Sequence, residues 1–101
     1  MTIYALSSGP GLSGVAVVRL SGPKSKEVIE KLTKDKVPKP RYASLKKIYK
    51  LNKDELIDEG IVLWFPSPKS YTGEDMAEFH IHGSTASVSY THLTLPTILR
   101  V

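Results

Sequence analysis

The 101-residue sequence predicts an α+β fold, with a mixed β-sheet of about five strands and few helices. Five segments show the β-branched density or the apolar–polar alternation that is typical of strands. One segment between the second and third of them repeats its apolar residues at helical spacing. Because so few helices cannot cover both faces of a sheet, a doubly wound fold is excluded.

Two strands are predicted before the helix. Residues 2–7 form a short β-rich run that ends in the turn formers Ser8, Gly9 and Pro10. Residues 14–20 have the apolar density of a strand that is buried on both faces. Arg19 therefore lies at the end of a buried strand.

The predicted helix begins near Pro23, which suits a first helical turn, and Ser21 is positioned to cap it. Lysine and glutamate occupy its outer positions, and the helix ends before Pro38. Its apolar positions are Val28, Ile29 and Leu32.

Three further strands are predicted after the helix, at residues 41–51, 58–65 and 76–82. The last of these alternates strictly, so its two faces differ in character. One face is apolar and the other is polar; the residues are Ala77, Phe79 and Ile81 on the first, and Glu78, His80 and His82 on the second.

Composition excludes several classes of protein. The sequence contains no cysteine, which rules out disulfides, thiolate zinc sites and cysteine nucleophiles. No apolar run approaches the ~20 residues that cross a bilayer, so a membrane protein is not expected. The N-terminus lacks the basic flank and apolar stretch of a secretory signal, which predicts a cytoplasmic protein.

Charge is strongly segregated along the chain. Residues 19–53 hold twelve basic and three acidic residues, whereas residues 54–86 hold one basic and seven acidic ones. The basic segment is compatible either with a small RNA-binding module or with a solvated lysine-rich helix and hairpin. No aromatic platform for stacking bases is interleaved with the basic residues, which favours the second interpretation.

A change of composition near Ser87 predicts a domain boundary. The last fifteen residues, SVSYTHLTLPTILRV, carry Arg100 as their one residue among Lys, Arg, Asp and Glu. The string resembles translated read-through of adapter or vector sequence. We therefore interpret residues 1–86 as one domain and residues 87–101 as a foreign tail.

The glycine-rich residues 9–14 satisfy the pattern G-x-G-x-x-G but precede a strand rather than a helix, so a dinucleotide site is not expected. The same stretch fails as a P-loop because Val15 and Ala16 stand where lysine and serine or threonine are required. A close-approach glycine turn is the favoured interpretation.

Four polar residues remain as candidates for a site. Arg19 needs an acceptor beside its apolar strand, and Glu78 needs a donor, so each forms a structural ion pair, with the other or with another side chain, or else contacts a ligand. A third interpretation is a His-ligated metalloenzyme, in which a metal is bound by His80, His82 and Glu78. No catalytic triad or nucleophile elbow can be assembled, and neither a catalytic residue nor a metal ligand is assigned.

Four blocks, taken together, resemble one family. They are GLSGVAVVRLSG at residues 11–22, PKPRYA at 38–43, DEGIVLWFP at 58–66, and SYTGED at 70–75 followed by His82-Gly83. In this order and spacing, residues 1–86 resemble the N-terminal domain of the MnmE (TrmE) tRNA-modification GTPases.

The resemblance implies a fold similar to the folate-binding domains of glycine-cleavage T-proteins and dimethylglycine oxidase. It implies a cytoplasmic, potassium-dependent GTPase that acts with an MnmG/GidA-like flavoprotein to modify the wobble uridine of tRNA, as in uridine 5-carboxymethylaminomethyl modification. It also implies a homodimer and a one-carbon-substituted tetrahydrofolate, either 5-formyl- or 5,10-methylene-tetrahydrofolate. Motif placement maps two folate-binding positions onto Arg19 and Glu78.

The GTPase motifs of the family are absent from these residues. The resemblance therefore implies a fragment that does not itself hydrolyse GTP, because GTP, potassium and magnesium bind in the GTPase domain. Its folate pocket is expected to be incomplete.

Overall fold

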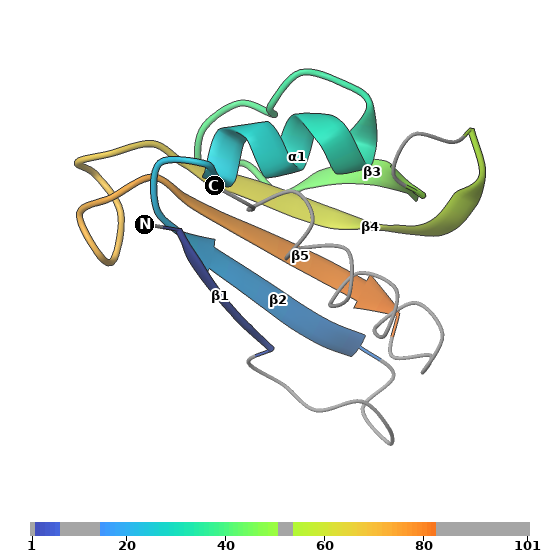
Figure 1. Ribbon diagram of the computed structural model, residues 1–101, viewed down its shortest axis with the longest axis horizontal. Coiled ribbons are helices and arrows are strands. Elements are labelled where there is room, and N and C mark those ends of the chain that lie inside the picture. The colour runs from blue at the N-terminus through green and yellow to red at the C-terminus, as the bar shows by residue number, and fades with distance from the viewer. Residues whose placement is uncertain (1, 7–14, 51–53, 83–101) are drawn as a thin grey trace.

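A computed structural model describes residues 2–6, 15–50 and 54–82. These residues form a single antiparallel sheet in the order β1-β2-β5-β4-β3, with a helix packed on one face (Figure 1). The predicted α+β class, the five strands and the order of elements along the chain are confirmed. The elements are β1 (Ile3–Leu6), β2 (Val15–Ser21), α1 (Ser25–Thr33), β3 (Ser44–Tyr49), β4 (Leu56–Phe65) and β5 (Met76–His82).

All four neighbouring strand pairs are antiparallel, whereas the sequence suggested a mixed sheet. A parallel pair needs a crossover between adjacent strands, usually a helix. Here the helical connection joins β2 to β3, which are not neighbours in the sheet. The shorter connections of β3 to β4 and of β4 to β5 join neighbours that run in opposite directions.

The core lies between α1 and one face of the sheet. In β2, Ala16, Val18 and Leu20 are buried, but Val17 is half-buried and Arg19 is exposed. The expectation that this strand is buried on both faces was therefore wrong, because α1 covers one face alone. The other face, called the open face below, carries the polar side of β5. The core also takes Val28, Ile29 and Leu32 from α1, Val62 and Trp64 from β4, and Phe79 and Ile81 from β5.

The helix starts later than its sequence suggested. Its N-cap residue is Lys24, which makes no side-chain cap, and Ser21 lies at the end of β2. The Ser21 hydroxyl is instead 2.8 Å from that of Thr72, so a tertiary contact has replaced the predicted cap. Ser25 donates from its side chain to the carbonyl of Gly22, which closes this turn at 2.9 Å.

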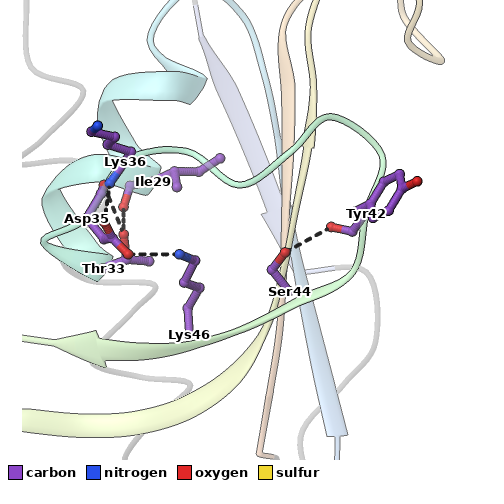
Figure 2. Close-up of polar contacts among 7 residues, drawn as sticks. All are labelled: Ile29, Thr33, Asp35, Lys36, Tyr42, Ser44 and Lys46. Carbon is purple, nitrogen blue, oxygen red and sulfur yellow. Dashed lines mark hydrogen bonds and ion pairs between the residues drawn. The ribbon is translucent and has the colours of Figure 1, made fainter.

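The C-terminal end of α1 is tied to β3 by charged side chains (Figure 2). Asp35 accepts a 2.8 Å hydrogen bond from the Nζ of Lys46 on β3 and a 2.7 Å bond from the backbone N–H of Lys36. The lysine-rich segment therefore lies on α1, β3 and the chain between them. Two of its other lysines pair with acidic residues ahead of β4, in Lys34–Asp54 at 2.7 Å and Lys50–Glu55 at 2.8 Å.

Some sequence predictions fall outside the described residues, namely the glycine-rich segment 9–14 and the tail at residues 87–101. Within the described ranges, no helix has the length and apolar character that a membrane crossing requires.

Candidate ligand-binding site

The open face brings Arg19 and Glu78 together at the middle of the sheet. Strands β2 and β5 are neighbours, and their register sets Arg19 directly opposite Glu78. The same row continues to Leu63 on β4 and Ala5 on β1. Residues that are distant in sequence thus meet because two non-consecutive strands pair.

Glu78 is held by two donors, one at each carboxylate oxygen. The Nε of Arg19 donates to Oε2 at 2.9 Å, and the Nε2 of His80 is 2.9 Å from Oε1. The Glu78 side chain is 17% exposed, compared with 51% for Arg19. The internal ion pair considered from the sequence is therefore formed, and one edge of it faces solvent.

Glu78 is ionised at neutral pH. Partial burial raises the pKa of Glu78, but hydrogen bonds from His80 and Arg19, together with the positive charge of Arg19, outweigh this effect. The net result is a pKa below the ordinary glutamate value. A carboxylate oxygen accepts two hydrogen bonds, so both oxygens of Glu78 keep capacity for a ligand.

A hollow of about 410 Å³ adjoins this ion pair and is lined by Arg19, Tyr71, Met76 and Glu78. Tyr71 stands at its rim and is 97% exposed. Met76 is buried, so it gives the hollow an apolar wall. The hollow thus combines an aromatic ring, an apolar surface and paired charges within one small space.

The loop between β4 and β5 positions Tyr71. The Ser21 hydroxyl contacts Thr72 on this loop, and Gly22 donates from its backbone to the carbonyl of Asp75 at 2.8 Å. The Asp75 carboxylate in turn accepts from the backbone N–H of Ser67 at 2.8 Å. The SYTGED block therefore holds the tip of the loop against the end of β2, beside the hollow.

Sequence reasoning selected Arg19 and Glu78 but missed Tyr71, Met76 and the bond from His80 to Glu78. Strand alternation did place His80 beside Glu78, and this signal was sufficient to suggest the contact. The sequence marks Tyr71 only as a member of the SYTGED block, because its position beside the hollow depends on the loop contacts with β2.

The metal alternative required three ligands on this face. Among the residues that the structure describes, no group of three His, Asp or Glu side chains is arranged to hold a metal ion. Glu78 and His80 are joined by a hydrogen bond, and the side chain of His82 lies outside the described residues.

These features define a small α+β domain with a charged hollow on an otherwise open sheet face. Residues 2–99 match the family described as GTP-binding protein TrmE N-terminus, and the chain belongs to this family. The resemblance stated from the sequence is thereby confirmed. The match continues to residue 99 and marks no boundary at residue 86, so the division into a domain and a tail stays a prediction.

Relatives occur in bacteria and in mitochondria. The chain is 61% identical over 98 residues to a tRNA modification GTPase MnmE of Pelagibacter ubique, which covers 97% of the chain and 22% of that protein. It is 58% identical over 88 residues to a mitochondrial 5-taurinomethyluridine tRNA synthase subunit of Danio rerio, and this match covers 87% of the chain and 17% of that protein. It is 50% identical over 90 residues to the mitochondrial tRNA modification GTPase mss1 of Schizosaccharomyces pombe, and this match covers 89% of the chain and 18% of that protein.

The chain thus spans about a fifth of the length of these relatives. It is the N-terminal domain of the tRNA-modification GTPase family, and the activity named for the relatives belongs to much longer proteins.

Proposed function

We propose that this chain is the folate-binding and dimerisation part of a GTPase that modifies the wobble uridine of tRNA. The hollow on the open face binds a one-carbon-substituted tetrahydrofolate, in its 5-formyl or 5,10-methylene form. The observation that carries this proposal is the juxtaposition of Glu78 and Arg19 beside Tyr71 and Met76, in a chain of this family.

Glu78 suits the pterin ring of a folate. The 2-amino-4-oxo ring presents adjacent N–H donors, which one ionised carboxylate accepts as a pair. The lowered pKa of Glu78 keeps this carboxylate ionised at neutral pH, and charge-assisted bonds are the stronger class.

Arg19 supplies the opposite chemistry. Its guanidinium uses one donor, Nε, on Glu78, and its other donors have no partner within the described residues. These donors suit a folate carbonyl or carboxylate. The exposed ring of Tyr71 offers a surface on which a flat heterocycle can stack.

The remaining parts of the proposal concern the whole protein. GTP, potassium and magnesium act in a GTPase domain beyond the residues of this chain. A second copy of the chain, an MnmG/GidA-like flavoprotein and tRNA are its partners, and its location is cytoplasmic. The description of the family supports the binding of GTP, the names of the relatives support the modification of tRNA, and the other statements follow from the family resemblance.

Calorimetric titration of the 101-residue chain with 5-formyl-tetrahydrofolate tests the proposal. We expect saturable binding, and at least an approximately tenfold loss of affinity in Glu78→Ala, because two charge-assisted bonds are removed. Glu30→Ala is the matched control, since Glu30 is exposed on α1, away from the hollow. Equal affinity of Glu78→Ala and the parent would show that the pterin assignment is wrong.

A further inference from the structure

His80 extends the site in a way that neither the sequence nor the family assignment specifies; the inference rests on the proposed folate-binding function. The Nε2 of His80 lies 2.9 Å from Oε1 of Glu78. Because an ionised carboxylate has no proton to donate, Nε2 must carry the hydrogen. His80 is thus a donor to Glu78, at the oxygen that Arg19 leaves free.

Within the described residues, the side chain of His80 makes its polar contact with Glu78. Val17 on β2 and Ile61 on β4 stand opposite His80 in register, and both are apolar. The His80 side chain is 31% exposed, so a proton can reach it from solvent. Among the residues whose side chains the structure describes, the other titratable or charged ones on this face or at its rim are Arg19, Tyr71, Glu59 and Lys47.

We propose that His80 is a positioning residue whose charge controls the affinity of Glu78 for the pterin ring. With neutral His80, the group of Arg19, Glu78 and His80 has no net charge, and the carboxylate is oriented with lone pairs available. Protonation of His80 gives the group a net positive charge, which opposes the N–H donors of the ligand and holds the carboxylate more tightly. Folate binding therefore weakens on acidification.

Histidine is the side chain that normally changes charge between pH ~5 and ~8, whereas glutamate and arginine keep their charge across this interval. If folate affinity changes below neutral pH and this change disappears when His80 is replaced, the change is therefore due to His80 and not to Glu78 or Arg19.

Two substitutions separate positioning from charge. His80→Gln keeps an N–H donor at a similar reach but cannot become charged, while His80→Leu removes both properties. Circular dichroism establishes that each variant is folded before its affinity is measured.

The experiment titrates the 101-residue chain and both variants with 5-formyl-tetrahydrofolate at several pH values between ~5.5 and ~8. We expect the affinity of the parent to fall by about tenfold toward the acid end, the size of one altered charge-assisted bond. His80→Gln keeps the high-pH affinity throughout. His80→Leu binds about tenfold more weakly at high pH and shows no pH dependence.

The possible outcomes distinguish a failure of the inference about His80 from a failure of the proposed folate-binding function. Absence of binding by the parent at every pH would overturn the folate proposal and the role of His80 with it. Binding that is independent of pH in the parent, or that keeps the same pH dependence in His80→Gln, would overturn the role of His80 alone. Should His80→Leu not fold, the parent and His80→Gln still decide the question.

Discussion

At the scale of single residues, the ion pair on the open face couples stability to pH. The pKa of Glu78 is lower in the folded chain than its ordinary value, so folding favours the ionised form. This contribution to stability is fully present above the unfolded pKa of glutamate, at about 4.3, and is lost as pH falls through the lower folded value. The pair therefore stabilises the domain at neutral pH and ceases to do so in acid.

We expect Glu78→Gln to lose less stability than the parent between pH ~6 and ~3, because the substituted residue does not titrate. Guanidinium chloride unfolding at several pH values measures this, with the fluorescence of Trp64, which is buried in the core, as the signal. Asp35 and Asp54 also have lowered pKa values because of Lys46 and Lys34, but they titrate in both proteins and cancel in the comparison. Parallel stability curves for parent and variant would contradict the assignment.

At the scale of elements, the position of His80 depends on how closely β4 approaches β5. A Cβ atom added to Gly60 would lie 2.3 Å from the backbone oxygen of His80 and 3.3 Å from the Cα of Ile81. Backbone atoms cannot move aside as the end of a flexible side chain can, so the two strands must separate. Glycine at position 60 is thus required by the packing of the sheet.

We expect Gly60→Ala to destabilise the domain by about 1–3 kcal/mol, the usual cost of an overpacked site. For a domain of this size, each kcal/mol lowers Tm by about 4–8 °C, which thermal unfolding followed by Trp64 fluorescence detects. Lys69→Ala is the matched control, since Lys69 is exposed in the loop that joins the same two strands. An unchanged Tm in Gly60→Ala would show that the strands do not approach so closely.

Local pattern predicted the elements well but not their tertiary partners. The alternation of β5 fixes its two faces, and the structure confirms Phe79 in the core and Glu78 on the opposite face. The opposition of Arg19 to Glu78 depends on pairing between strands that are far apart along the chain, which periodicity does not encode. Ser21 illustrates the same limit, because its contact with Thr72 replaced the cap that local sequence suggested.

At the scale of the whole molecule, the two charged regions lie in different places. The ion pair and hollow are on β2, β5 and the loop before β5, whereas residues 24–50, with ten basic and three acidic residues, form α1, β3 and their connection. A second groove of about 610 Å³ runs between the end of α1 and β3, lined by Thr33, Tyr49 and three lysines among other residues. Folate binding and contact with an RNA backbone are thus compatible on one domain, although the sequence presented them as alternatives.

Substitution of Lys47 tests whether tRNA, a proposed partner of the whole protein, contacts this groove. Lys47 is exposed, lines the second groove and forms no salt bridge with the described residues, so a phosphate does not have to displace a carboxylate from it. We expect the affinity of the chain for tRNA to fall steeply with salt, and Lys47→Ala to reduce the slope of log K against log salt concentration by about 1. Fluorescence anisotropy with labelled tRNA across a salt series measures both quantities. Lys69→Ala, which removes the same charge from the exposed loop between β4 and β5, should leave the slope unchanged. An equal slope for Lys47→Ala and the parent would show that the groove does not contact the RNA backbone, whatever the outcome of the folate titration.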